Sequence, residues 1–296
     1  MNALNRGELV VPGATLYFEV RGSGEPLLLI PGSASDAVVF EPLAEVLAAD
    51  HRVICYDPRG ISRSPLDGPP VDQRVEVHTE DARRLLDRLT EPDEPVRVFG
   101  SCGGGLVAME LAVRHPELIR TAVAHEPPAT GLLPEAEQYR AFFDRVHEVF
   151  RRDGVASALR ALQPLFGGRP APPLPEFRDN FPYFLAHLML PFTRFLPDLD
   201  ALATVADRIV VAGGRDSRGY PVHRPAVVLA AWLGRRPVEF PGGHVGYAKD
   251  PDAFAARLVE VFAAAPEPRA LPNRGCCSRA DGARAEGAPE PTELRS

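Results

Sequence analysis

The chain has 296 residues, and its 40 acidic and 33 basic side chains give it a formal net charge of −7 at pH 7. An acidic chain without a block of Lys and Arg is a poor candidate for binding nucleic acid or an anionic membrane surface. No apolar run approaches the roughly 18 residues that a membrane span needs, and the N-terminal stretch MNALNRGELVV lacks the apolar segment of a signal peptide. We therefore expect a cytoplasmic globular protein, and the length allows one large α/β domain.

The cysteines do not form a recognisable set. Four cysteines in a chain of this length do not make a disulfide framework, and they lack the Cys-x-x-Cys spacing and paired histidines of a zinc site. No metal is therefore expected. Lys249 is the single lysine among the 33 basic residues, and this bias toward Arg, with many Ala, Pro and Gly, is typical of a GC-rich bacterial genome.

Short β-rich runs alternate with helical patterns over the first part of the chain. The expected strands are Leu9–Val11, Ala14–Val20, Pro26–Ile30, Arg52–Tyr56, Val96–Phe99 and Thr121–Ala124. The expected helices are Phe40–Ala49, Val75–Leu89 and Leu106–Arg114. Continuous apolar runs such as PLLLI are typical of strands buried on both faces. The alternation predicts a mostly parallel sheet with helices on both faces.

The alternation stops at about residue 129 and resumes near residue 200. Between them the sequence predicts only helices, over Glu135–Arg152, Val155–Leu165, Glu176–Leu190 and a stretch toward Leu202. We interpret residues 129–199 as a helical cap over a pocket, with the aromatic Phe184 as a candidate substrate contact.

The last part of the chain completes the expected core and adds a tail. The strands Arg208–Ala212 and Pro237–Phe240 and the helices Ala226–Leu233 and Ala253–Ala264 are expected there. The predicted core therefore comprises residues 8–128 and 200–265. Residues 266–296 contain almost no large apolar side chain, so we predict a disordered tail in which Cys276 and Cys277 are incidental.

The glycine cluster after the fifth strand is the main indication of chemistry. A nucleophile elbow is a tight strand–turn–helix motif that needs small residues two positions before and after the nucleophile. Gly100-Ser101-Cys102-Gly103-Gly104 meets this rule with Cys102 at its centre. Centring it on Ser101 would place Phe99 at a small position, so Ser101 is the weaker candidate.

Two other interpretations of the cluster remain open. Cys102 could be a buried cysteine that acts only as a small apolar side chain. The run GGGLVA also fits a loose dinucleotide fingerprint, G-x-G-x-x-A. That fingerprint normally opens the first βαβ unit and is followed by an acid at the end of the next strand, whereas several strands precede this cluster.

A nucleophile of this kind needs a base, and the base needs an acid that orients it. His244 lies in the glycine-rich loop PGGHVG that follows the last expected strand, and Asp216 follows the strand RIVVA. The order nucleophile, acid, histidine is the order in this architecture. His125 and Glu126 also close a strand on this side, so they could contact substrate, or Glu126 could replace Asp216 as the acid.

Five segments occur in the order typical of one family, namely LLLIPGS, YDPRGISRS, VFGSCGGGLVAMELAVRHPELI, AGGRDS and PGGHVGY. Over about residues 8–263 the chain resembles α/β-hydrolase-fold proteins. The resemblance implies a sheet of about eight mostly parallel strands, a helical cap after the sixth strand, and the triad Cys102, His244 and Asp216. It also implies an oxyanion hole formed by the backbone N–H groups of Ser33 and Gly103, with Gly32 as a candidate substrate contact.

The sequence departs from the family pattern at three places. Pro31 stands where the family often has His, and Ile61-Ser62 stand in a turn that usually carries a second glycine. Cys102 stands where most members have Ser, and its surroundings, G-x-C-x-G-G, resemble those of dienelactone hydrolases. A thiol at a helix N-terminus beside a histidine is readily ionised, and the acyl-enzyme that it forms is a thioester.

These features together predict a hydrolase that acts on the carbonyl carbon of an ester, thioester or lactone and needs no cofactor. Its expected partner is a small acyl substrate. An acyltransferase, cyclase or lyase on the same scaffold is the alternative, and a non-catalytic ligand-binding protein is a third possibility, because the fold does not determine the function.

Overall fold

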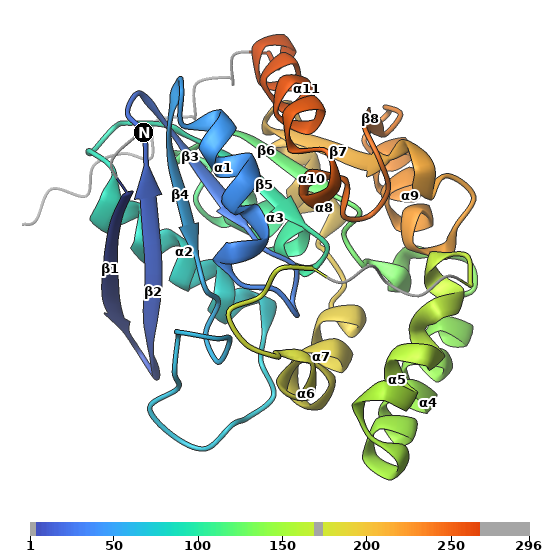
Figure 1. The fold of residues 1–296 in the computed structure, drawn as a ribbon. Helices are drawn as coiled ribbons and strands as arrows, with labels where there is room; N and C mark the ends of the chain where they lie inside the picture. Colours follow the sequence, from blue (N-terminus) through green and yellow to red (C-terminus); the bar gives the residue numbers. More distant parts are fainter. Residues whose placement is uncertain (1–3, 169–173, 267–296) are drawn as a thin grey trace, which may run out of the picture.

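The computed structural model describes residues 4–168 and 174–266, which form an eight-stranded sheet flanked by helices (Figure 1). The strands are β1 (Leu4–Val11), β2 (Ala14–Arg21), β3 (Glu25–Ile30), β4 (His51–Tyr56), β5 (Val96–Ser101), β6 (Ile119–His125), β7 (Ile209–Gly214) and β8 (Val238–Phe240). Their order across the sheet is β1-β2-β4-β3-β5-β6-β7-β8. The pairings of β2 with β1 and β4 are antiparallel and the others are parallel, which confirms the predicted mostly parallel sheet.

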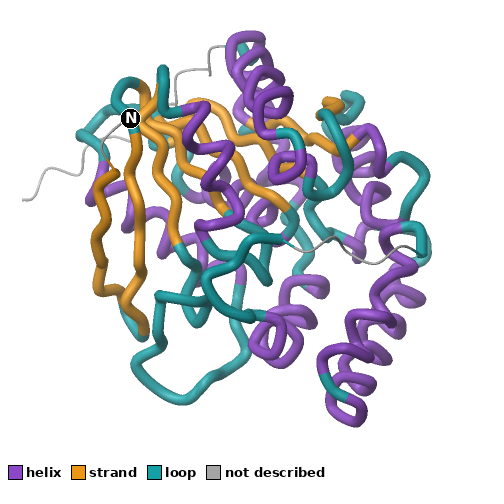
Figure 2. Tube along the Cα trace, viewed as in Figure 1, coloured by secondary structure: helices purple, strands orange, loops and turns teal. Residues whose placement is uncertain are grey.

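The α-helices of the described residues lie on both sides of this sheet (Figure 2), and α4 to α8 stand between β6 and β7 in the chain. They are α1 (Glu41–Leu47), α2 (Val75–Leu89), α3 (Gly103–Arg114), α4 (Ala136–Asp153), α5 (Val155–Leu162), α6 (Phe181–Tyr183), α7 (Met189–Arg194), α8 (Leu199–Thr204), α9 (Arg224–Trp232), α10 (Gly246–Lys249) and α11 (Pro251–Ala264). The expected helix over Val75–Leu89 is found with those bounds.

Successive residues of the central strands face opposite layers of the core. In β3, Leu28 and Ile30 pack in the layer formed with α2, α3, α8 and α9. Leu27 and Leu29 pack in the other layer, formed with α1 and α11. Since side chains alternate along a strand, a strand buried on both faces has to be apolar throughout. This is why PLLLI carries no polar residue.

The described residues of the segment between β6 and β7 contain helices but no strand, and they have a small apolar cluster of their own. Phe143 and Val146 of α4, Ala158 of α5 and Met189 of α7 belong to that cluster. The expected helix from Glu176 begins only at α6, since residues 174–180 form no helix. Asn180 is instead held by a tertiary contact, because its side-chain oxygen accepts a hydrogen bond from the Ser62 backbone N–H at 3.0 Å.

Some expectations fall on other parts of the chain. Residues 267–296, with Cys276 and Cys277, lie outside the described residues.

Of the helices in residues 4–168 and 174–266, none combines the length and the apolarity that a bilayer-spanning helix requires.

Candidate active site

Cys102 lies at the tight turn between β5 and α3. Its backbone has φ 52° and ψ −121°, in a region that residues with a side chain rarely adopt. The preceding Ser101 is completely buried in the strand, whereas Cys102 is partly exposed. The turn therefore presents the thiol, and not the Ser101 hydroxyl, at the carboxyl edge of the sheet.

The glycines on either side explain why the chain can make this turn. A Cβ on Gly100 would lie 2.1 Å from the Gly104 carbonyl oxygen. A Cβ on Gly104 would lie 2.3 Å and 2.5 Å from the carbonyl oxygens of Ile30 and Pro31. Because backbone atoms block both positions, no side chain fits there. The small-x-nucleophile-x-small spacing in the sequence thus corresponds to a real steric limit.

His244 is the histidine that meets this turn. It lies in the loop after β8, and its side chain is 15% exposed. Interaction with the Cys102 side chain raises the pKa of His244, and Nδ1 of His244 lies 2.7 Å from Oε2 of Glu126. Nδ1 therefore donates to the carboxylate, and Nε2 is free for the thiol side. This order of contacts is Cys102, His244, Glu126.

The structure differs from the expectation that Asp216 orients His244. The Asp216 side chain is 68% exposed and its carboxylate lies 3.8 Å from Nε of Arg215. Residues 215–217 form a short 3-10 helix directly after β7, and this turn directs the Asp216 carboxylate to solvent. The alternative acid, Glu126, occupies the place beside the histidine.

Glu126 is completely buried and is held by several donors. Its Oε1 accepts hydrogen bonds from the Gly214 backbone N–H at 2.9 Å and from Nδ1 of His223 at 3.1 Å. Its own backbone has φ 47°, at the point where the chain leaves β6. A buried carboxylate is stable only when charged partners and hydrogen bonds compensate for its lost hydration, and here they do.

The pKa values of Glu126 and His244 are shifted in opposite directions. Burial opposes ionisation of Glu126, but hydrogen bonds from His223 and His244 lower the pKa of its carboxyl group far below the usual value. Burial likewise opposes the charged form of His244, yet the Cys102 side chain and the Glu126 carboxylate raise its pKa to about 10. At neutral pH His244 is therefore an imidazolium between two groups that favour its charge.

The other expected substrate contacts are Gly32, His125 and Glu126, and they differ in their position relative to the nucleophile. Gly32 lies close to the nucleophile, because a Cβ on it would be 3.4 Å from Cβ of Cys102. His125 and Glu126 are both fully buried, and their side chains lie beneath the surface around the nucleophile. The His125 ring packs among Phe99, Phe240 and Phe254, and burial lowers its pKa to about 4.

Phe184, the aromatic residue expected to contact substrate, is partly buried and packs between two apolar clusters. Sequence reasoning missed the aromatic residues that do lie near the site. The Phe166 ring is 5.4 Å from the His244 ring, and Phe192 of α7 approaches Gly103 closely. The aromatic character of the segment was visible in the sequence, but not which rings point to the site.

The two residues expected to form the oxyanion hole are Ser33, in the loop after β3, and Gly103, at the start of α3. Gly103 is the first residue of α3, so its N–H has no intrahelical acceptor. A Cβ on Gly103 would lie 1.9 Å from Oγ of Ser33, which places the two expected donor residues side by side. These residues are held against the Cys102 turn.

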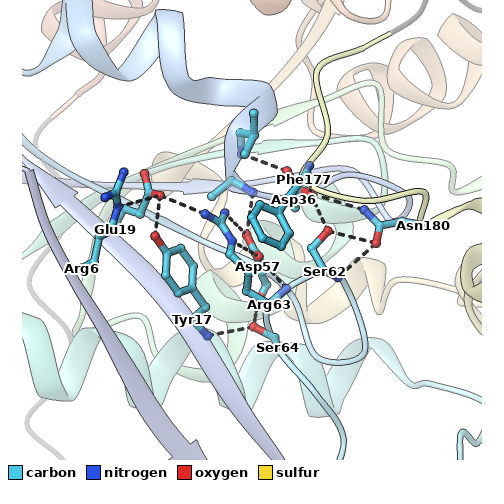
Figure 3. A network of polar contacts seen from close by, with 12 residues as sticks. Arg6, Tyr17, Glu19, Asp36, Asp57, Ser62, Arg63, Ser64, Phe177 and Asn180 are labelled. Atoms are coloured by element: carbon cyan, nitrogen blue, oxygen red, sulfur yellow. Dashed lines mark hydrogen bonds and ion pairs between the residues drawn. The ribbon is translucent and has the colours of Figure 1, made fainter.

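A polar network fixes this loop to its surroundings (Figure 3). The Asp36 carboxylate accepts hydrogen bonds from Oγ of Ser62 at 2.5 Å and from the Phe177 backbone N–H at 2.8 Å. The neighbouring Asp57 carboxylate accepts from the Ala37 N–H at 2.9 Å and is bound by Arg63, whose Nε lies 2.7 Å from Oδ2. The loop after β3 is thereby joined to the loop after β4 and to the segment before α6.

The described residues contain no group of three or more His, Cys, Asp or Glu side chains that could hold a metal ion. The polar groups that the structure brings together at the carboxyl edge of the sheet are Cys102, His244 and Glu126.

Comparisons with known proteins agree with this architecture. The model of the α/β hydrolase fold family matches residues 25–162. "Uncharacterized hydrolase YraK" of Bacillus subtilis is 35% identical over 265 residues, which are 88% of this chain and 96% of that protein.

Two solved structures are similar at low identity and so indicate a shared fold alone. A thermophilic esterase from Thermogutta terrifontis has a TM-score of 0.67 at 21% identity, with 88% of this chain and 98% of that chain covered. The enol-lactonase from Burkholderia xenovorans has a TM-score of 0.64 at 19% identity, with 87% and 99% covered. Because the relative in Bacillus matches nearly end to end, the chain belongs to the α/β-hydrolase fold family.

Proposed function

We propose that the protein hydrolyses small esters, thioesters or lactones through a Cys102–His244–Glu126 triad. The observation that carries the proposal is the contact order at the carboxyl edge of the sheet. The nucleophile stands at a turn with positive φ, and the adjacent histidine is oriented by a carboxylate at 2.7 Å. This is the arrangement in which a nucleophile, a base and an orienting acid act as a unit.

The first half-reaction forms an acyl-enzyme. The Cys102 sulfur attacks the carbonyl carbon, and the carbonyl π electrons move to the oxygen, whose charge is stabilised by the N–H groups of Ser33 and Gly103. Collapse of this intermediate breaks the bond to the leaving group, which takes a proton from Nε2 of His244. The product is a thioester on Cys102 and a neutral His244.

The second half-reaction regenerates the enzyme. His244 now accepts a proton from water, and the water oxygen attacks the thioester carbonyl. Collapse of the second intermediate breaks the C–S bond and releases a carboxylic acid and the thiolate. Glu126 stays ionised throughout, because its hydrogen bonds favour the carboxylate, and it keeps the proton of His244 on Nδ1.

The helical segment 129–199 would act as the cap. Phe166 lies against His244 and Phe192 against Gly103, so side chains of this segment flank the reacting atoms on two sides. The relative in Bacillus subtilis is named as a hydrolase, which supports hydrolysis and leaves the substrate open.

The test compares cysteine variants with acetyl-N-acetylcysteamine and p-nitrophenyl acetate as substrates. Cys102→Ala should abolish turnover, and Cys102→Ser should retain a weak esterase. Cys55→Ala is the matched control, because Cys55 is a buried cysteine in β4 whose thiol has a pKa raised to about 12 by burial. Full activity of Cys102→Ala would disprove the proposal.

The same experiment separates hydrolysis from acyl transfer. A thioester intermediate reacts readily with amines and thiols as well as with water, so the nucleophile itself favours transfer as the second candidate. Product analysis in water alone and with an added amine measures the partition. An amide that forms faster than the free acid would favour acyl transfer.

A further inference from the structure

A small cavity lies beside the loop that carries the expected oxyanion donors. Its volume is about 10 Å³, and the residues that line it include Ser33, Tyr56, His78, Gly104 and Phe192. Such a volume accommodates about one water-sized group. Ser33 and Gly104 are immediate neighbours of the oxyanion site, so the cavity adjoins the reacting carbonyl.

Two polar atoms of the lining residues lack partners. The Tyr56 hydroxyl and Nε2 of His78 are buried and have no hydrogen-bond partner within residues 4–168 and 174–266. Both side chains are nearly inaccessible, with Tyr56 1% and His78 4% exposed. An unpaired buried polar atom costs about 1–3 kcal/mol, so the two atoms favour a guest that can hydrogen-bond.

The cavity is uncharged at neutral pH. Burial and the nearby Arg59 lower the pKa of His78 to about 3, so its ring is neutral. The ring is further held by an edge contact with Phe192 at 5.2 Å between centroids. A small site without charge excludes carboxylates and ammonium groups, because it cannot replace their hydration. It suits a hydroxyl group.

The sheet topology indicates which part of a substrate reaches this cavity. β5, which leads to Cys102, has β3 and β4 on one side and β6, β7 and β8 on the other. His244 follows β8 and protonates the leaving group, so the leaving group has to lie on that side. The acyl group then extends toward the ends of β3 and β4, where Ser33 and Tyr56 line the cavity.

We propose that Tyr56 and His78 form a subsite for the α-hydroxyl group of a short 2-hydroxyacyl substrate. This inference rests on the proposed acyl hydrolysis at Cys102 and specifies the acyl group that the site prefers. The Tyr56 hydroxyl and Nε2 of His78 hydrogen-bond the substrate hydroxyl, which replaces the water that would otherwise occupy the cavity. A methyl group in that place leaves both polar atoms unpaired.

The experiment compares N-acetylcysteamine thioesters of acetate, propionate and glycolate. Glycolyl and propionyl groups differ by a hydroxyl in place of a methyl on the α carbon, so they match in size. Each kcat/KM is divided by the rate of hydroxide-catalysed hydrolysis of the same thioester, which removes differences in intrinsic reactivity. For the wild type we expect a glycolyl-to-propionyl ratio of about ten, since each hydrogen bond contributes a factor of a few.

Tyr56→Phe and His78→Phe should lower this ratio to about two or less. Tyr183→Phe is the matched control, because the Tyr183 hydroxyl is also buried without a partner in the described part of the chain but does not line the cavity. It should keep the wild-type ratio.

The outcomes distinguish the two proposals. A wild-type ratio near one with normal acetyl turnover means that the cavity holds only a resident water, and it overturns the subsite. A ratio of ten that Tyr56→Phe and His78→Phe leave unchanged overturns its assignment to this cavity. Failure to hydrolyse or be acylated by all three thioesters overturns the proposed hydrolysis, and the subsite with it.

Discussion

Replacement of Glu126 by Gln tests the proposal that this residue is the acid that orients His244. The carboxylate accepts hydrogen bonds from Gly214, His223 and His244 at 2.9, 3.1 and 2.7 Å. An amide of the same size keeps one acceptor oxygen, but its NH₂ group faces a donor. His244 then loses the negative charge beside it, and no carboxylate holds its proton on Nδ1.

The magnitude follows from the burial of the pair. Breaking a buried ion pair costs about 3–5 kcal/mol, and each 1.36 kcal/mol corresponds to a factor of ten. If the transition state bears this whole cost, kcat/KM for a small thioester falls about 150- to 5,000-fold in Glu126→Gln. Asp216→Asn is the control, and its exposed side chain should make it equal to the wild type within about twofold.

A pH series checks that the loss acts through His244. Its pKa is raised to about 10, so the stability that its partners provide is complete below its unfolded value of about 6.5 and disappears as the pH rises through 10. The difference in unfolding free energy between wild type and Glu126→Gln, measured with urea, should therefore be smaller at pH 10 than at pH 7. The reasoning is refuted if Asp216→Asn loses more activity than Glu126→Gln.

Three further predictions concern residues around the site. The pKa of His125 is lowered to about 4 in the folded protein, so the unfolded chain takes up the proton first as the pH falls. The free energy of unfolding should therefore fall by up to about 3 kcal/mol between pH 6.5 and pH 4. In urea titrations, His125→Phe should make this fall shallower. Gly104→Ala should lower the unfolding free energy by about 3 kcal/mol or more through contact with backbone oxygens, whereas Gly68→Ala, in open space, should not; equal melting temperatures would contradict the elbow geometry. Asp36→Ala releases the loop after β3 from its network, and kcat/KM should fall about tenfold; a change below twofold would show that the network does not position the loop.

The sequence was sufficient for the features that depend on local pattern. The apolar run PLLLI and the spacing of Gly100 and Gly104 each express a short-range steric or burial requirement, and both predict the structure correctly. The place of Cys102 at the turn between β5 and α3 follows from the glycine spacing. Patterns of this kind can be read because the constraint lies within a few neighbouring residues.

The identity of the acid depends on side-chain direction, which the pattern does not contain. Asp216 and Glu126 both follow a strand that ends at the same edge. The 3-10 turn after β7 directs Asp216 outward, whereas the positive φ of Glu126 and the donors around it direct that carboxylate inward. The non-helical stretch before α6 has the same origin, since Asn180 and Phe177 bond to loops far away in the sequence.

The most direct test of the central proposal is to trap the acyl-enzyme. The wild-type protein is mixed with p-nitrophenyl acetate, quenched in acid within the first turnovers, digested and mapped by mass spectrometry. We predict an acetyl group on the peptide that contains Cys102, absent from Cys102→Ala and longer-lived in Glu126→Gln, whose histidine activates water poorly. Turnover of the ester with no acetyl group on Cys102 at any quench time would contradict nucleophilic catalysis by this residue.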